Sequence, residues 1–170
     1  MENIIKELKG KSTIKLLFIC SGNIIRSVMA QFLFKKYIES EIDSVDKFEI
    51  NSGAVLFKND AIDEKTKKIL LNEGIKKGLD EFKPTYLKSK ENMHYLEEAD
   101  AIIAMEASHI RMIPKKFRSK AFLLTDLSKT PKKLPDPFGA DIKPYIESFQ
   151  KIKPLIIQLI DVFKKYDIIT

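Results

Sequence analysis

The sequence predicts an α/β protein: a three-layer sandwich in which a four-stranded parallel sheet carries helices on both faces. Two observations support this fold. Four short apolar runs recur along the chain, and longer stretches with helical periodicity separate them. The runs are nearly continuous in apolar side chains, which is typical of parallel strands buried on both faces.

The first half of the chain supplies two strands and the helix between them. Residues 14–19 form an apolar run with isoleucine at both ends, the composition of a buried strand. Residues 27–40 follow as a helix, because apolar and lysine-bearing positions separate onto different sides. Residues 48–51 alternate between apolar and polar and stop before a glycine, which predicts the second strand.

The second half repeats this alternation. Residues 61–73 and 89–98 have helical character, and residues 101–105 and 121–124 are apolar runs that predict the third and fourth strands. A long amphipathic helix is predicted over residues 143–166. In parallel sheets of this kind, ligands bind where strand carboxyl ends meet helix N-termini. The loop after the first strand is therefore the first candidate site.

The chain is expected to form one domain preceded by a short extension. Residues 1–12 are mostly polar and come before the first apolar run, so we predict an N-terminal extension followed by a domain over 13–170. A chain of 170 residues is long enough to bury a core without disulfides or a structural metal.

The composition excludes several classes of function. A net charge of +6 is spread over lysines among 24 acidic residues, so it does not by itself indicate a nucleic-acid partner. One cysteine excludes an internal disulfide and a Cys/His zinc site, and His94 and His109 fall in helical stretches as predicted surface or interface residues. Neither a secretory signal nor a membrane span of roughly 20 apolar residues is evident. We expect a cytoplasmic protein without metal, cofactor or membrane association.

The loop after the first strand, Cys20–Ser27, reads Cys-Ser-Gly-Asn-Ile-Ile-Arg-Ser. A loop wound around an oxyanion turns its backbone N–H groups inward, and Gly22 and Asn23 readily adopt the left-handed dihedrals that this requires. The helix that follows adds the partial positive charge of its N-terminus. The planar fork of Arg26 suits two phosphate oxygens. This pattern predicts a phosphate-binding loop.

Cys20 lies in the same positive field, which favours the thiolate over the thiol. Ser27 is placed to donate a hydrogen bond to the sulfur. A thiolate in line with a bound phosphorus atom is a nucleophile for phosphoryl transfer. A lone cysteine that ends a strand is usually only a small buried hydrophobe. The glycine, asparagine, arginine and serine that follow it here favour catalysis instead.

Four segments resemble one known family. Phe18–Ser27 resembles the active-site loop of the low-molecular-weight protein tyrosine phosphatases, typically C-x-G-N-x-C-R-S. Asn51–Ala54 is similar to the family's segment after the second strand, and Glu97–Met105 to its third strand. Asp136–Gly139 resembles its acid loop. The resemblance covers residues 14–165, nearly the whole chain.

The resemblance implies catalysis through a cysteinyl-phosphate intermediate. It assigns the nucleophile to Cys20, charge stabilisation to Arg26 and the general acid to Asp136, an aspartate that would otherwise be an ordinary loop residue between two prolines. Phe138 is expected to wall the substrate slot and stack on a phenyl phosphate. The phosphate-binding residues would be those of the loop: Ser21, Gly22, Asn23, Ile24, Ile25, Arg26 and Ser27.

The sequence departs from the family pattern in the loop and in its support. Ile25 stands where most members have a second cysteine. Phe82 stands where many members have a histidine that supports the loop asparagine. We therefore expect Ser52 to support Asn23 in this chain.

The favoured function is hydrolysis of phosphotyrosine in a protein substrate, with inorganic phosphate as product and a monomer or weak dimer as the active form. Ile24 follows the loop asparagine. In this it resembles phosphotyrosine enzymes, whereas the arginine-specific group has threonine at this position. A phosphoarginine phosphatase and a thiol-dependent arsenate reductase of the same fold are alternatives. A non-catalytic phosphate-binding module is the alternative outside enzymes.

Overall fold

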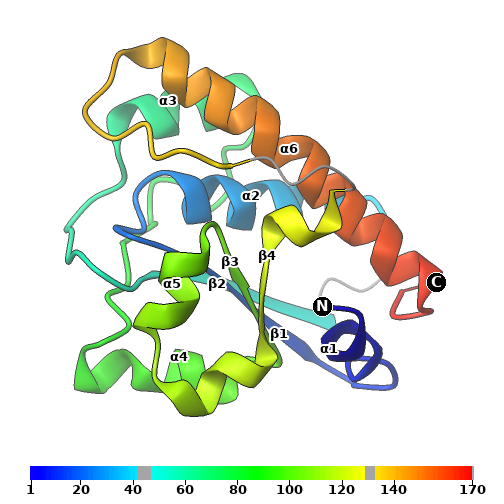
Figure 1. Cartoon of the computed structure of the whole chain (residues 1–170). Helices are drawn as coiled ribbons and strands as arrows, with labels where there is room; N and C mark the ends of the chain where they lie inside the picture. The colour runs from blue at the N-terminus through cyan, green and yellow to red at the C-terminus, as the bar shows by residue number, and fades with distance from the viewer. Residues whose placement is uncertain (42–46, 129–132, 170) are drawn as a thin grey trace.

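A computed structural model of the chain describes residues 1–41, 47–128 and 133–169. Its centre is a four-stranded sheet in the order β2-β1-β3-β4, and every neighbouring pair is parallel (Figure 1). The predicted parallel sheet and its four strands are confirmed. The strands are β1 (Ile14–Cys20), β2 (Phe48–Ala54), β3 (Ala101–Ala104) and β4 (Ala121–Leu123).

Helices cover both faces of the sheet, which confirms the predicted three layers. In Figure 1, α2, α3 and α6 lie together on one side of the sheet, and α4 and α5 lie on the other. The α-helices are α1 (Glu2–Lys6), α2 (Arg26–Glu39), α3 (Glu64–Asn72), α4 (Met93–Glu98), α5 (Ala107–Met112) and α6 (Ile142–Lys165). Short 3₁₀ turns are η2 (Lys90–Asn92), η3 (Lys115–Lys120) and η4 (Leu124–Leu127).

The apolar run of β1 is explained by its central place in the sheet. Leu16 and Phe18 enter the core formed with α2 and α6. Leu17 and Ile19 point to the opposite face and enter a second core with residues of α4 and η3. Successive side chains of a strand alternate between the two faces, so a strand covered on both sides is apolar where it is covered; Lys15, near the start of β1, is only half-buried.

The N-terminal segment packs against the domain despite its polar composition. It contains the short helix α1, and Ile5 and Leu8 are fully buried in the core on the α2 and α6 side. Lys9 also pairs with Asp167 at 2.9 Å, which links the two ends of the chain. The domain boundary at residue 12 stays a prediction. Ile5 and Leu8, with the partly buried Met1 and Ile4 beside them, dock a segment that is otherwise polar.

The sheet topology places one crevice at the end of β1. The chain leaves β1 through α2 to reach β2 on one side, while β3 and β4 lie on the other side. In this order of strands, the carboxyl ends of β1 and β3 border the point where the connections diverge, the usual ligand site of such sheets. Cys20 ends β1 at this point.

Among the described residues, no helix has both the length and the apolar character to cross a membrane.

Candidate active site

The Cys20–Ser27 loop joins the end of β1 to the start of α2 and is held closely from outside. Asn23 has a backbone φ of 53°, the left-handed conformation expected for a loop that turns its amides inward. Asn59 donates its side-chain Nδ2 to the carbonyl oxygen of Gly22 at 2.8 Å. A Cβ on Gly22 would lie 2.9 Å from that nitrogen, so glycine permits the close approach. The contact with Asn59 thus explains why the loop has glycine at position 22.

The side chain of Asn23 is buried behind the loop and has a fixed orientation. The backbone N–H of Thr85 donates to its Oδ1 at 2.9 Å, and a backbone N–H can only donate. The Nδ2 group therefore faces Ser27 Oγ at 2.9 Å and Ser52 Oγ at 2.7 Å, and donates to both. Ser52 in turn donates to Gln31 Oε1. Ser52 thus contacts Asn23, and Thr85 is a partner that the sequence interpretation missed.

This orientation determines what reaches the sulfur of Cys20. Ser27 Oγ accepts from Asn23, so its own hydroxyl hydrogen is available to Cys20 Sγ, 3.0 Å away. The backbone N–H of Asn23 also points to Sγ at 3.3 Å. Two hydrogen-bond donors are therefore directed at one sulfur. We call Asn23, Ser27, Ser52 and Thr85 the amide–hydroxyl network.

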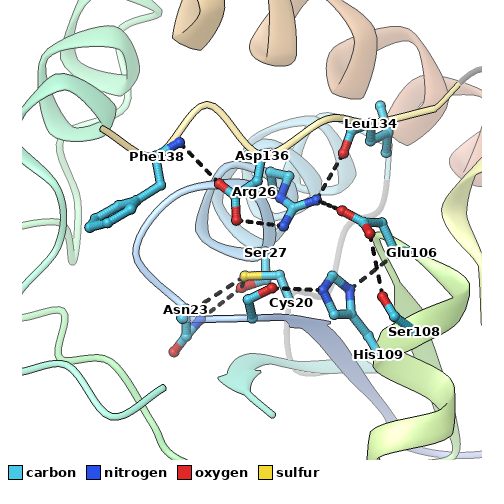
Figure 2. A network of polar contacts seen from close by, with 12 residues as sticks. Cys20, Asn23, Arg26, Ser27, Glu106, Ser108, His109, Leu134, Asp136 and Phe138 are labelled. Carbon is cyan, nitrogen blue, oxygen red and sulfur yellow. Dashed lines mark hydrogen bonds and ion pairs between the residues drawn. The ribbon is translucent and has the colours of Figure 1, made fainter. Parts of the chain in front are cut away.

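Arg26 opens α2 and is buried, with 1% of its surface exposed. Its Nη1 donates to the Glu106 carboxylate and, at 2.8 Å, to the carbonyl oxygen of Leu134 (Figure 2). Its Nη2 donates to Asp136 Oδ2 at 2.7 Å. The other carboxylate oxygen of Asp136 accepts from the backbone N–H of Phe138 at 3.2 Å. The guanidinium is therefore held between two carboxylates that come from opposite sides.

Glu106 lies two residues after the end of β3, at the start of α5, and was not predicted as a site residue. Partial burial opposes its ionisation, but the hydrogen bond and positive charge of Arg26 outweigh burial, and the pKa of Glu106 is lowered. Ser108 Oγ donates to its Oε2 at 3.3 Å. The carboxylate is thus a stable counter-ion for the arginine.

His109 lies beside this group and is buried, with 1% of its surface exposed. The prediction that it is a surface or interface residue is wrong, because it is buried within the domain, whereas His94 is exposed. The backbone N–H of Glu106 donates to Nδ1 of His109 at 3.1 Å, and Nε2 lies 3.0 Å from Ser21 Oγ. Burial first, and then the charge of Arg26, lower the pKa of His109 to about 4. The spacing of Glu106 and His109 is that of a helix capping box, the one sequence signal for this contact.

A pocket of about 320 Å³ opens over the loop. Cys20, Arg26 and Asp136 line it together, so the structure brings the three predicted catalytic residues to one place. Within the described parts of the chain, no acceptor is found for the backbone N–H groups of Ile24 and Ile25, which also line the pocket. Those amides are available to an oxyanion. The pocket residues are Cys20, Ser21, Gly22, Ile24, Ile25, Arg26, Phe57, Lys58, Asn59, Asp136 and Phe138.

Two aromatic side chains stand at the mouth of this pocket. Phe138 is 69% exposed and Phe57 is 58% exposed, and they come from separate loops. Phe57 was not predicted, because one phenylalanine in a loop carries no signal of its own. A larger hollow of about 780 Å³ lies between α2 and residues 74–83, but Cys20, Arg26 and Asp136 do not line it. Both rings line the pocket over the loop and remain largely exposed, so they are accessible to a group that enters it.

The described residues contain no group of three or more His, Cys, Asp or Glu side chains arranged to hold a metal ion. The three charged groups of the site are instead paired with one another, since Arg26 contacts both Glu106 and Asp136. The chemistry that this arrangement supports is therefore that of a thiolate, a guanidinium and a carboxyl group.

Comparison with known proteins places most of the chain in one group. Residues 15–167 match the family described as low molecular weight phosphotyrosine protein phosphatase. A protein-arginine-phosphatase of Bacillus subtilis is 29% identical over 160 residues, covering 88% of this chain and 97% of that protein. The low-molecular-weight protein-tyrosine-phosphatase PtpB of Staphylococcus aureus is 26% identical over 153 residues, covering 87% and 98%.

A solved structure has the same fold over nearly its full length. The crystal structure of YfkJ from Bacillus subtilis superposes with a TM-score of 0.76 at 28% sequence identity. The match covers 92% of this chain and 98% of that one. The sheet, its covering helices and the loop after β1 therefore belong to a shared architecture.

Proposed function

We propose that this chain, which belongs to the low-molecular-weight phosphotyrosine protein phosphatase family, hydrolyses phosphotyrosine in proteins through a cysteinyl-phosphate on Cys20. One observation carries the proposal. A sulfur with two hydrogen-bond donors, a buried guanidinium and a carboxylate border a single pocket of about 320 Å³. Binding of phosphate alone would need neither the thiol nor the carboxyl group.

In the first step, the Cys20 thiolate attacks phosphorus. The S–P bond forms with the electron pair of the sulfur, while the bond from phosphorus to the tyrosine oxygen breaks. Arg26 and the loop amides hold the three remaining phosphate oxygens and stabilise the charge that builds up there. Asp136, in its protonated form, gives its proton to the departing tyrosine oxygen. The products are the cysteinyl-phosphate and a neutral tyrosine side chain.

Arg26 and Asp136 must change partners in this step. The guanidinium now donates from Nη2 to Asp136, and the oxygens of an entering phosphate compete for that donor. Arg26 then turns its charge to the phosphate, and the Asp136 carboxyl is released to face the leaving group. Glu106 and the Leu134 carbonyl hold the other end of the guanidinium, so Arg26 stays in the pocket.

In the second step, the Asp136 carboxylate takes a proton from a water molecule that attacks phosphorus. The new P–O bond forms as the S–P bond breaks, and the electron pair returns to sulfur as the thiolate. Inorganic phosphate leaves and Asp136 is again protonated. The two donors from Ser27 and Asn23 stabilise sulfur as a leaving group for the same reason that they stabilise it as a nucleophile.

The walls of the pocket support an aromatic substrate. Phe57 and Phe138 offer ring faces at its mouth, and Ile24 adds an apolar surface next to the loop. Lys58 lines the same mouth. Its positive charge repels the positively charged guanidinium group of phosphoarginine, so it disfavours that substrate. Phosphoarginine is the second candidate, because the 29% identical relative from Bacillus subtilis is a protein-arginine-phosphatase.

A substrate panel tests the proposal. We expect turnover of p-nitrophenyl phosphate and of a phosphotyrosine peptide, with kcat/KM for the latter at least about tenfold above that of a matched phosphoarginine peptide, which corresponds to about 1.4 kcal/mol. Arsenate with an added thiol should give no reduction. The reverse peptide preference would make the chain an arginine phosphatase, and phosphate binding without any turnover would make it a binding module.

We further infer that the enzyme uses no cofactor, acts as a monomer or weak dimer in the cytoplasm, and recognises a phosphorylated protein rather than nucleic acid. The mechanism above is complete with side chains and water, which supports the first point. Analytical ultracentrifugation at assay concentrations tests the oligomeric state.

A further inference from the structure

A buried imidazole connects the Cys20–Ser27 loop to the counter-ion of Arg26. We propose that His109 is a positioning residue of the active site: it holds the Ser21 hydroxyl with one ring nitrogen and the backbone of Glu106 with the other. The proposal rests on the proposed phosphatase function. Figure 2 shows the ring between the loop and Glu106. No step of the proposed mechanism uses His109, and it touches neither the sulfur nor Asp136 through a hydrogen bond.

The hydrogen-bond partners assign the tautomer of the ring. The Glu106 backbone N–H lies 3.1 Å from Nδ1 and can only donate, so Nδ1 carries no proton. The neutral ring must then carry its proton on Nε2, which faces Ser21 Oγ at 3.0 Å. Nε2–H therefore donates to Ser21. Burial and the charge of Arg26 keep the ring neutral at neutral pH, with a pKa of about 4, although Glu106 and Asp136 act in the opposite direction.

Through Ser21, His109 reaches two parts of the pocket. Ser21 follows the nucleophile directly, so a fixed hydroxyl restrains the first turn of the loop. The carbonyl oxygen of Ser21 also accepts the backbone N–H groups of Leu56 and Phe57, each at 3.0 Å. One residue thus ties the loop to the segment that carries the aromatic ring Phe57. A shift of Ser21 would move both the phosphate site and the substrate wall.

Through Glu106, the same ring reaches the guanidinium. Its Nδ1 fixes the Glu106 backbone at the start of α5, and the Glu106 side chain accepts from Arg26. The ring therefore sets the distance between α5 and the loop. Phosphoryl transfer depends on position to within fractions of an ångström, so such a tether affects rate without touching substrate.

Two matched variants separate the two contacts of the ring. In His109→Gln the amide nitrogen takes the place of Nε2, which keeps a donor for Ser21 but loses the acceptor for Glu106. In His109→Asn the amide oxygen takes the place of Nδ1, which keeps the cap of α5 but loses the donor for Ser21. Ser21→Ala removes the hydroxyl and leaves every backbone amide of the loop in place.

The experiment measures kcat and KM with p-nitrophenyl phosphate and, independently of turnover, the Kd of vanadate. We expect His109→Asn to weaken vanadate binding and kcat/KM by about fivefold, the effect of one hydrogen bond of about 1 kcal/mol. Ser21→Ala should give a similar loss, and the double variant no further loss, because both changes break the same contact. His109→Gln keeps the donor for Ser21 and should therefore weaken vanadate binding less than His109→Asn does.

Three results would overturn the proposal. Wild-type values in His109→Asn would show that the tether is not used. Additive losses in the double variant would show that the two residues act separately. Equal losses in His109→Gln and His109→Asn, in step with equal losses of Tm, would reduce His109 to a structural role. If the wild type turned over no phosphate ester, the proposed function would fail, while the vanadate measurements would still decide whether His109 positions the loop.

Discussion

The two sides of the Cys20–Ser27 loop are built from different chemistry. Behind the sulfur, the amide–hydroxyl network is neutral and largely buried, and its hydrogen bonds run in one direction from the Thr85 N–H to Cys20 Sγ. Around Arg26 the contacts are ionic. The Glu106 and Asp136 side chains remain 43% and 38% exposed beside a guanidinium that is 1% exposed.

The difference separates a constant part of the site from an adjustable part. The neutral network contains no group that titrates, so it directs the same two donors at sulfur throughout a reaction. The ionic side has to change, since Asp136 must leave Arg26 when phosphate enters and must both give and take a proton. Partial exposure makes that exchange inexpensive, because solvent screens an ion pair that is broken and remade.

Replacing the nucleophile should have the largest effect. Cys20→Ser removes the thiolate but leaves the loop amides and Arg26, so we expect kcat to fall at least about a thousandfold while vanadate or phosphate still binds. Steady-state kinetics and calorimetry with inorganic phosphate measure the two properties. Residual activity within tenfold of the wild type would contradict the assignment of Cys20.

Replacing the acid should break the adjustable side alone. Asp136→Asn should slow aryl phosphates with poor leaving groups by about 10²–10⁴-fold and those with good leaving groups much less, since only the former need the proton. A series of substituted phenyl phosphates measures this dependence. Equal losses across the series would move the acid to another residue.

The direction of hydrogen bonding in the amide–hydroxyl network can be reversed by replacing one NH2 group with an oxygen. In Asn23→Asp the side chain can no longer donate, so Ser27 turns its hydroxyl hydrogen away from sulfur and toward the new carboxylate. We expect alkylation of Cys20 by iodoacetamide at pH 6 to slow about tenfold, which corresponds to about 1.4 kcal/mol lost from the thiolate.

Ser52→Ala is the matched control for this change. It removes one acceptor of Asn23 and keeps the contact between Ser27 and the sulfur. Its alkylation rate should remain within about twofold of the wild type. Equal effects of the two substitutions would mean that orientation of the asparagine, rather than donation through Ser27, controls the sulfur.

The last expected effect concerns stability rather than the reaction. The pKa of His109 is lowered in the folded protein, from 6.5 to about 4, so between these values the unfolded chain binds a proton that the folded chain does not. The free energy of unfolding should therefore fall as the pH decreases from 6.5 to 4, by at most about 3 kcal/mol more in the wild type than in His109→Gln. Urea unfolding at several pH values measures this, and parallel curves for the two proteins would contradict it.

The parts of the fold that were predictable are those encoded within a few residues of one another. The apolar runs of β1 and β3 and the Cys20–Ser27 loop carry their signal locally, whereas Asp136 was assigned only through the family resemblance. The contacts of the ionic side carry no such local signal. Arg26 meets Glu106 and Ser21 meets His109 only because β3 pairs with β1, so α5 begins beside the loop.

Strand order is a property of the whole sheet, and the pattern of apolar runs does not encode it. For the same reason Phe57 and Thr85, which reach the site from the far end of β2 and from the segment before α4, were not predicted. The packing of the N-terminal segment was missed although its signal is present, since Met1, Ile4, Ile5 and Leu8 stand at i, i+3, i+4 and i+7, the spacing of one helix face.

The lone thiol has a consequence for oxidative stress. Cys20 is the only cysteine in the chain, and Ile25 is its buried neighbour in the loop. Peroxide converts a thiolate to a sulfenic acid, which is rescued most directly when a second thiol condenses with it. Here that second thiol has to come from another molecule. The recovery of the enzyme after an oxidative burst then depends on the concentration of small thiols around it, so the fraction of active enzyme follows the redox state of its surroundings.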